Sequence, residues 1–219
     1  VDGTRDRPAD PVNVLIDGGT IREVGPKVSS QKARIIDLKG RTLMPGLIDC
    51  HVHVVAVMAD LGANAKLPDS LVTSRSFKLM NRMLMRGFTS VRDLGGPVFG
   101  LKKSIDTGIV AGPRIWPSGA FISQSGGHGD FRVPNDMPAR PGDFTYSERV
   151  GAAAIADDPD TVRKRAREQL ALGASQIKLM AGGGVASSFD PLDVTQYTVE
   201  ELRAAVQAAD NWGTYVTVH

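Results

Sequence analysis

The sequence predicts an α/β fold, in which parallel strands alternate with helices, preceded by a small β-rich segment. Two observations carry this prediction. From about residue 43, short apolar runs typical of buried strands alternate with runs that have the apolar spacing of amphipathic helices, and five strands can be counted. Strands separated by helices favour parallel pairing with helical crossovers, whereas residues 1–42 show only short strands and tight turns.

The β-rich segment begins with a hairpin pattern. In VNVLIDGGTIREVG, alternating apolar residues stand on either side of Asp17, Gly18 and Gly19, and such a turn sequence is typical of a hairpin. The stretch ARIIDLKGRTL, residues 33–43, has a similar pattern and predicts a second unit of strand, turn and strand.

The elements after residue 42 alternate regularly. TLMPGLIDCHVHV predicts a buried strand, and the helix SLVTSRSFKLMNRMLMRG should end at Gly87, which suits a helix C-terminus. A later helix begins with Thr198 and Glu201 in the spacing of a capping box. The connection from Ala120 to Asp158 is too long for an ordinary link, and loops of that length are usually functional or disordered. Further strands are predicted at FTSVRDLGG, PRIWPSGAF, SQIKLMAGGG and TYVTVH, and further helices at GLKKSIDTGIVAG and DPDTVRKRAREQLALG.

Composition and charge argue against several classes of partner. The formal net charge is +2 and the positive residues form no block, which argues against a nucleic-acid partner. No apolar run approaches the roughly 20 residues that span a bilayer, so no membrane partner is expected. The single cysteine, Cys50, excludes an internal disulfide framework. The chain begins at Val1 rather than Met, so the compartment stays open, and the cytoplasm is favoured over export as an expectation.

The first residues that could carry chemistry are two histidines at the end of the first predicted barrel-type strand. His51 and His53 lie two apart, so both side chains point to the same face, which Asp49 shares. Imidazole is a common zinc ligand, at about 2.0–2.1 Å. The spacing alone is a weak pattern, and it fits equally two polar residues where a strand meets solvent.

Other candidates stand at later strand ends, which is where a parallel α/β barrel carries its functional residues. Lys178 lies inside the apolar stretch IKLM, and lysines are almost never fully buried without a partner. It either reaches water or reacts with carbon dioxide to form a carbamate that bridges two metal ions. Asp93 is interpreted as structural and Arg92, on the opposite face, as an outer ion-pair partner. The glycines 182–184 lack the Lys and Ser or Thr of a phosphate loop.

These stretches resemble a known family. PGLIDCHVH resembles the signature of the amidohydrolase superfamily, and Lys178 before a glycine run and His219 in YVTVH match its later ligands in order and rough spacing. TSVRDLGG, GPRIWPSG, GGHGD and IKLMAGGG are similar to the branch of prolidase-like and imidazolonepropionase-related hydrolases. The resemblance implies an incomplete TIM-type (β/α)8 barrel, with its first five βα units in residues 43–219, after part of a small β-sandwich-like domain in residues 1–42.

The resemblance also implies an activity. Members of this branch hydrolyse Xaa-Pro and other dipeptides, N-acyl amino acids and related amides, so a small-molecule amide or dipeptide is the expected substrate. Two divalent metal ions, with zinc as the expected metal, would be bound. His51 and His53 would hold the more buried ion, Lys178 would bridge as a carbamate, and His219 would hold the second ion. His128 in SQSGGHGDF would contact substrate, unless it merely satisfies a backbone group of its loop.

The sequence departs from the family pattern at its end. The family has a further histidine ligand on the sixth strand and a proton-shuttling aspartate on the eighth, and no residue follows His219. We therefore expect this sequence to be the N-terminal half of a longer enzyme that requires the C-terminal remainder of the barrel. The isolated chain should have negligible activity, and its oligomeric state stays open, with a homo-oligomer one possibility.

Two alternatives remain at this point. One is a cyclic-amide C–N hydrolase of the imidazolonepropionase or cytosine-deaminase type, which uses one metal ion and no lysine bridge; Lys178 argues against it. The other is a non-catalytic half-barrel module, which would have no need for four metal ligands at its strand ends.

Overall fold

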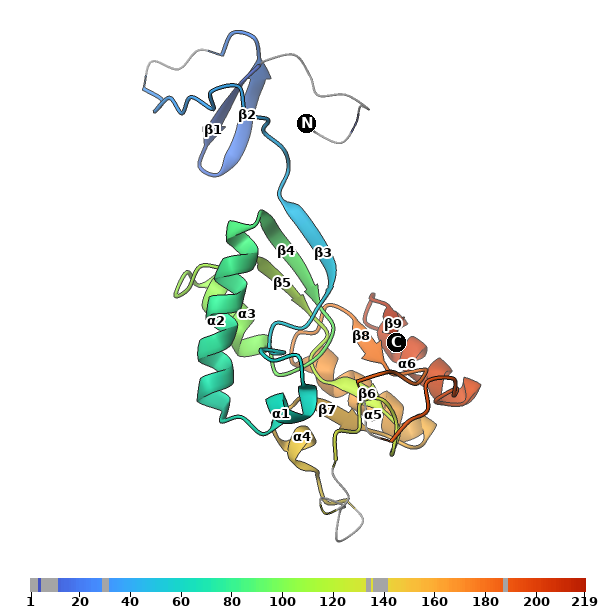
Figure 1. Cartoon of the computed structure of the whole chain (residues 1–219). Coiled ribbons are helices and arrows are strands. Elements are labelled where there is room, and N and C mark those ends of the chain that lie inside the picture. The colour runs from blue at the N-terminus through green and yellow to red at the C-terminus, as the bar shows by residue number, and fades with distance from the viewer. Residues whose placement is uncertain (1–3, 5–11, 29–31, 133–134, 136–141, 187–188) are drawn as a thin grey trace. The chain divides into compact units, whose positions relative to one another are not determined.

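Figure 1 shows the computed structural model of the protein, which describes residues 4, 12–28, 32–132, 135, 142–186 and 189–219. Contacts divide the chain into two compact units, Val1–Gly46 and Leu47–His219. Within the described residues, the first unit holds an antiparallel pair of strands, and the second holds the helices and two parallel sheets.

The hairpin of the first unit forms where the sequence predicts it. Strand β1 (Asn13–Asp17) pairs antiparallel with strand β2 (Thr20–Gly25). Gly18 and Gly19 have φ angles of 56° and 77°. Two-residue hairpin turns require such positive φ angles, and glycine adopts them without a steric cost.

The second predicted pair of strands in this unit does not form. Residues 33–43 are all described and contain no strand, although the predicted turn is present at Lys39 and Gly40, both with positive φ. A strand is stabilised by a neighbouring strand, and none of the described residues pairs with this segment, whose Ile35 and Ile36 side chains are exposed. The segment therefore has the residue pattern of a strand but, among the described residues, no neighbouring strand to pair with.

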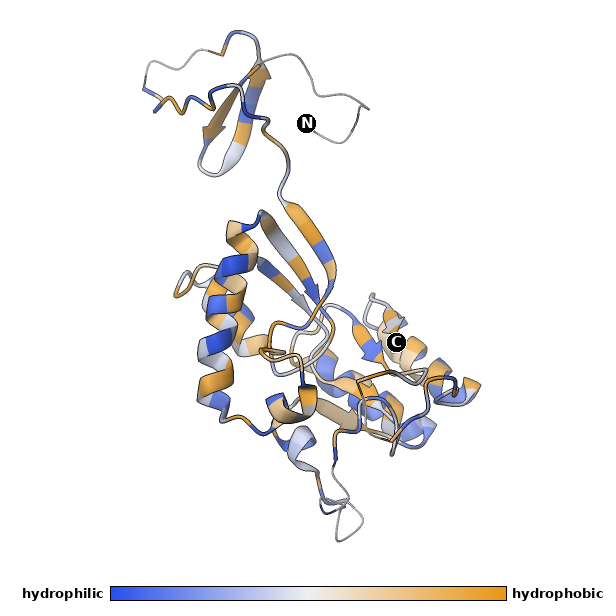
Figure 2. Cartoon of the chain, viewed as in Figure 1, coloured by the Kyte–Doolittle hydropathy of each residue, from blue (hydrophilic) through white to orange (hydrophobic). Residues whose placement is uncertain are grey.

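The first parallel sheet of the second unit has the order β3-β4-β5. Helix α2 packs against β4 and helix α3 against β5, and Figure 2 shows apolar and polar residues alternating along α2. Gly87 follows the last turn of α2 with φ of 96°, so the predicted C-terminus is confirmed. The elements are β3 (Leu47–Val52), α1 (Leu61–Ala65), α2 (Asp69–Met85), β4 (Phe88–Asp93), α3 (Phe99–Asp106) and β5 (Arg114–Pro117).

Strand β3 is more exposed than the sequence predicts. Its apolar run indicates a buried strand, but Ile48 is 66% exposed and Leu47 is exposed as well. β3 stands at one edge of its sheet, where β4 covers one side only. An apolar run indicates that a strand can be buried, whereas burial itself needs other elements packed on the faces of the sheet.

The second parallel sheet has the order β7-β6-β8-β9. Helices α5 and α6 pack against each other and cover this sheet, as Figure 1 shows. The predicted capping box is confirmed, because Thr198 and Glu201 exchange hydrogen bonds at the start of α6. The elements are β6 (Phe121–Ser123), α4 (Tyr146–Arg149), β7 (Ala153–Ile155), α5 (Pro159–Ala171), β8 (Ile177–Leu179), α6 (Val199–Asp210) and β9 (Val216–Val218).

One predicted strand is interrupted by a turn, and the two parts belong to different sheets. PRIWPSGAF forms β5 and the first residue of β6 rather than one strand, because Gly119 turns the chain with φ of 73° where a Cβ would overlap the Gln169 side chain. The turn stays attached on one side, since the Ser118 N–H donates to the Asp93 carbonyl at 2.9 Å. β5 can therefore pair with β4 while β6 pairs with β8.

The long connection between Ala120 and Asp158 is not a continuous loop. It contains β6, α4 and β7, and residues 133–134 and 136–141 lie outside the described residues. The two larger apolar clusters support the sheets: one lies between the sheet β3-β4-β5 and helices α2 and α3, and the other between the sheet β7-β6-β8-β9 and helices α5 and α6. A smaller cluster contains Phe121, Ala153 and Met180. Among the helices of the described residues, none combines the length and the apolar content needed to traverse a bilayer.

Candidate functional site

The four histidines of the sequence and Lys178 come together at the carboxyl ends of the parallel strands. His51 belongs to β3, and His53 follows it; their ring centroids are 5.5 Å apart. Lys178 lies in β8, and His219 directly follows β9. The His219 ring stacks on His128, with centroids 4.1 Å apart. β3 and β4 are parallel, and so are β8 and β9, so within each sheet the carboxyl ends of the strands lie at one edge. The charge of Lys178 lowers the pKa of both His51 and His53, so the strand ends of the two sheets lie near each other.

Lys178 is the most unusual side chain of this group. It is only 1% exposed, and its Nζ atom has no hydrogen-bond partner among the described residues. Burial lowers the pKa of Lys178 to about 8, and the positive charge of Arg92 adds to this effect. A buried amine without a partner costs free energy as an ammonium, so the neutral, nucleophilic form of the side chain is more populated here than in a lysine exposed to water.

The pKa of each of the three strand-end histidines is also lowered, which favours the neutral form of the ring. Burial, followed by the charge of His51, lowers the pKa of His53 to about 4, against an opposing backbone hydrogen bond with Gly95. The pKa of His51 is lowered mainly by burial and then by the charge of Lys178. Burial and then the charge of His128 lower the pKa of His219. Neutral imidazoles keep the lone pair that a metal ion requires.

The donor set fits divalent metal ions, although the side chains are not arranged around one. Among the described residues, no group of three or more His, Cys, Asp and Glu side chains has the arrangement of a metal site. One of the four predicted ligands is a lysine, and the imidazoles contact one another, as the stacked pair of His219 and His128 shows. Three neutral imidazoles near a buried amine that lacks a partner are nevertheless the chemistry that such ions would satisfy.

His128 is placed beside the ligand candidates by the loop after β6. The residue is 8% exposed, its backbone N–H donates to the Gln196 side-chain oxygen at 3.0 Å, and its Nδ1 lies 3.4 Å from an oxygen of Asp190. The loop is braced from within, because Asp130 forms a buried ion pair with Arg132. Both the backbone and the ring of His128 are therefore fixed before any ligand binds.

Asp190 and Gln196 were missed by the sequence analysis. Both are buried and contact His128, yet they lie more than 60 residues away in the sequence. The only signal was the glycine run 182–184, because adjacent glycines often mark a close approach of the backbone to another group. Nothing local indicates which group that is.

Asp93 ties the ends of two strands together, which agrees with its predicted structural role. The carboxylate is fully buried and accepts hydrogen bonds from the N–H groups of Val54 at 2.7 Å and Gly95 at 3.1 Å. Burial raises the pKa of Asp93 to about 7, although the two hydrogen bonds oppose this shift. One side chain therefore holds both the backbone that follows His53 and the turn that follows β4.

Arg92 has a different role from the predicted outer ion pair. Its guanidinium donates to the Cys50 carbonyl at 2.8 Å and to the Tyr215 hydroxyl at 3.1 Å, and it lies 5.9 Å from the Tyr215 ring centroid. Among the described residues, Arg92 has no ion pair. Because β4 buries Val91 in the core under α2, Arg92 faces the other side of the sheet, toward β9.

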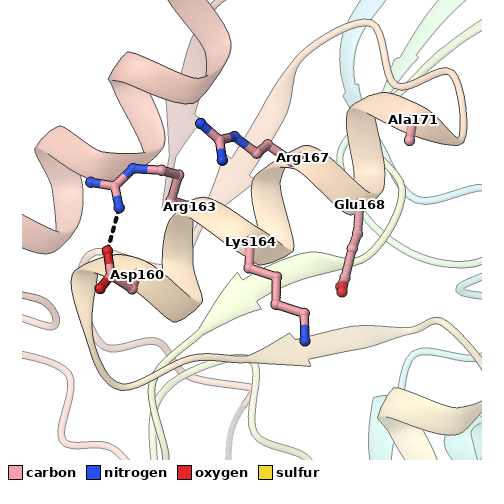
Figure 3. Close-up of a pocket in the computed structure, with 6 residues that line it drawn as sticks. All are labelled: Asp160, Arg163, Lys164, Arg167, Glu168 and Ala171. Atoms are coloured by element: carbon pink, nitrogen blue, oxygen red, sulfur yellow. Dashed lines mark hydrogen bonds and ion pairs between the residues drawn. The ribbon is translucent and has the colours of Figure 1, made fainter.

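A surface depression along α5 is a separate feature. Figure 3 shows its charged lining, in which Arg163 and Asp160 form an ion pair. The depression contains none of the candidate ligands and lies on the solvent side of the helix, so it is not part of the site. Its lining residues are Asp160, Arg163, Lys164, Arg167, Glu168 and Ala171.

Comparisons with known proteins agree with this fold. Ochratoxinase of Aspergillus niger is 35% identical over 189 residues, which cover 81% of this chain and 38% of that protein. The crystal structure of a prolidase complexed with N-methylphosphonate-L-proline is 46% identical, with a TM-score of 0.89, over 96% of this chain and 52% of that one. The crystal structure of a Xaa-Pro dipeptidase with bound methionine in its active site is 31% identical, with a TM-score of 0.82, over 100% of this chain and 54% of that one.

The chain thus spans about half the length of these solved structures and 38% of the length of ochratoxinase. Its α/β fold matches amidohydrolase neighbours of the TIM-barrel type over that half, and the predicted resemblance to prolidase-like amidohydrolases is confirmed. The model of the amidohydrolase family matches residues 42–219, which include both parallel sheets and every candidate ligand. The chain therefore belongs to the amidohydrolase family.

Proposed function

We propose that this chain carries half of the active site of a metal-dependent hydrolase that cleaves amide or peptide bonds. The observation that carries the proposal is Lys178, a buried lysine whose Nζ lacks a hydrogen-bond partner and stands near three neutral imidazoles. A buried polar atom without a partner is costly, and a site that retains one is suited to a ligand that supplies the partner.

The family supports metal dependence in general, because amidohydrolases typically require metal. The similarity to a prolidase and to a Xaa-Pro dipeptidase supports a short peptide as the substrate, and the similarity to ochratoxinase fits a related amide. We therefore take Xaa-Pro and other dipeptides, together with N-acyl amino acids, as the substrate class.

The residues of the chain divide the ligand roles. His51 and His53 would hold one divalent ion, and His219 the other, with zinc as the expected metal. Lys178 would become the bridging group. Its neutral Nζ attacks the carbon of carbon dioxide, a C–N bond forms, one proton leaves, and a carbamate with two donor oxygens remains. With a pKa of about 8, about one Lys178 in ten is neutral at pH 7 and available for this reaction.

Two divalent ions bound there would supply an activated water nucleophile and polarise the amide carbonyl. His128, held over His219, would contact the substrate at its carboxylate or at the scissile carbonyl oxygen. Lys178 is buried, and burial strengthens the electrostatic interactions of its side chain.

The remaining parts of the barrel are also part of the proposal. Strands β3 and β9 stand at the outer edges of their sheets, and Ile48 of β3 is exposed. Further strands at these edges would cover the apolar surface and would contribute the last histidine ligand and the carboxylate that moves the proton to the leaving amine. The matched share of the solved structures, about half, supports this arrangement.

Metal analysis of the intact protein, meaning this chain together with the proposed remainder of the barrel, tests the proposal. The wild type should bind two metal ions per chain, and protein exposed to 13C-labelled bicarbonate should show a carbamate carbon signal. Lys178→Ala should lose that signal and the paired metals, whereas Lys164→Ala, at an exposed lysine on α5, should keep both. One ion per chain, unaffected by Lys178→Ala, would instead indicate the mononuclear C–N hydrolase type.

A further inference from the structure

Asp190 is a buried carboxylate that the proposed chemistry does not use. Its side chain is 2% exposed, and its Oδ2 accepts hydrogen bonds from the Gly184 N–H at 2.9 Å and from the Gln196 amide at 3.2 Å. The same oxygen lies 3.4 Å from Nδ1 of His128. Asp190 therefore connects the glycine loop after β8 with the histidine loop after β6.

Gln196 completes the connection from the other side. Its side-chain oxygen accepts the His128 backbone N–H at 3.0 Å, while its side-chain nitrogen donates to Asp190. The position of this segment is itself fixed, because the N–H of the next residue, Tyr197, donates to the Gln124 side chain at 3.0 Å. One carboxylate and one amide thus hold the ring and the backbone of His128 together.

Gly184 makes this close arrangement possible. A Cβ at this position would overlap the Nδ1, Cε1 and Nε2 edge of the His128 ring, so only glycine lets the backbone approach. The neighbouring Gly182 has no such contact, since its nearest neighbours would be 3.8 Å from a Cβ. The glycine run, which is not a phosphate loop, thus has a specific task at Gly184.

We infer that Asp190 is a positioning residue that keeps a proton on Nδ1 of His128 and so leaves Nε2 as the atom that meets the substrate. A carboxylate beside one ring nitrogen selects the proton position and the ring orientation, as it does for metal-bound histidines. The ring face is set as well, because His128 stacks on His219. The catalytic consequence rests on the proposed function, whereas the proton position does not.

Nitrogen NMR of the intact, metal-free protein with 15N-labelled histidine tests the inference. The His128 signals are those lost in His128→Gln. In the wild type, Nδ1 should carry a proton in nearly all molecules. In Asp190→Asn this fraction should fall below half, because the new amide can also donate to Nδ1. Asp193→Asn, an exposed carboxylate in the same segment, should leave the fraction unchanged. An unprotonated Nδ1 in the wild type, or an unchanged fraction in a folded Asp190→Asn, overturns the inference.

A second pair of variants covers the case in which Asp190→Asn does not fold. Gly184→Ala should displace the ring and change the His128 signals, whereas Gly182→Ala should not. In the metal-loaded enzyme, Asp190→Asn should lower kcat/KM for amide substrates by roughly 10–100-fold with unchanged metal content. If the wild type hydrolyses no amide, the proposed function fails, and the Nδ1 measurement still decides the role of Asp190.

Discussion

Lys178 and His128 are both buried beside the same strand ends, but their surroundings are opposite. The Nζ atom of Lys178 has no hydrogen-bond partner among the described residues. His128, in contrast, is held at its backbone by Gln196, at its ring nitrogen by Asp190 and on its ring face by His219. The burial of Lys178 costs free energy because its amine lacks a hydrogen-bond partner, whereas the polar groups of His128 have partners.

The difference separates two kinds of functional residue. A buried group without a partner lowers the stability of the empty protein, and a ligand can recover that free energy on binding. A buried group with partners on several sides loses little on binding and fixes geometry beforehand. We therefore expect Lys178 to act through what it binds and His128 to act through where it is held.

The largest effect is expected from the substitution that removes the buried amine of Lys178. Lys178→Ala should lower kcat/KM of the intact enzyme for Xaa-Pro dipeptides by at least about 10³-fold, because the bridging ligand is lost. Steady-state kinetics with Lys164→Ala as the control measures this effect. If turnover by Lys178→Ala stays within tenfold of the wild type, Lys178 does not act by binding the metals, and the contrast with His128 disappears.

A second variant should separate the effect of Lys178 on protein stability from its proposed role in binding metal. Lys178→Met keeps an apolar stem of similar length and removes the buried amine. In metal-free protein at pH 7 it should raise the free energy of unfolding by up to about 3 kcal/mol, since the pKa of Lys178 falls from 10.5 to about 8. Denaturant unfolding measures the change, and Lys164→Met should give none.

The same shift predicts a pH dependence. The pKa of Lys178 is lower in the folded state, so between pH 8 and 10.5 the unfolded chain binds more protons. The wild type should therefore gain stability as pH rises through that window, and the full penalty should be present below pH 8. Lys178→Met should lack this gain, and an identical gain in both proteins would show that it comes from other groups.

A smaller effect is expected from disturbing the residue that is already held. Gly184→Ala should lower kcat/KM by about 10–100-fold, comparable to the loss of other supporting contacts, without lowering metal content. Gly182→Ala is the matched control, because it adds the same methyl group where space exists. Equal activity of the two variants would mean that the position of the His128 ring does not matter for turnover.

The smallest effect is expected from a substitution that changes neither Lys178 nor His128. Thr198→Ala removes half of the capping box of α6 and should lower the free energy of unfolding by about 1 kcal/mol. Thr73→Ala, at an exposed position inside α2, is the control and should cost nothing. The His128 NMR signals should be the same in both variants; a change with Thr198→Ala would show that the contacts of Asp190 and Gln196 with His128 depend on the stability of α6.

Local signals in the sequence predicted local structure well. Gly18 and Gly19 indicated the hairpin, Gly87 the end of α2, and Thr198 with Glu201 the start of α6. Each of these features depends on residues within a few positions of one another, so the sequence carries the whole of the information. The candidate ligands were found in the same way, from residue types at the ends of apolar runs.

The errors arose where a distant neighbour decides the outcome. Residues 33–43 alternate like strands but have no partner among the described residues, and Ile48 of the edge strand β3 is exposed. Arg92 was expected to form an ion pair, but it meets the hydroxyl of Tyr215, which is 123 residues away. Periodicity describes one chain segment and contains no statement about what packs against it.

By itself, the sequence determined the α/β class and the alternation of the long helices with parallel strands, because helix and strand periods and turn residues act over short distances. It also offered His51, His53, Lys178 and His219 as candidate ligands, and their role as ligands stays a prediction. Only the tertiary structure decided that the Lys178 amine is buried without a partner and that Asp190, through Gly184 and Gln196, holds His128. Burial and hydrogen bonding between segments depend on which groups the fold brings within a few ångströms, and that is a property of the packed chain.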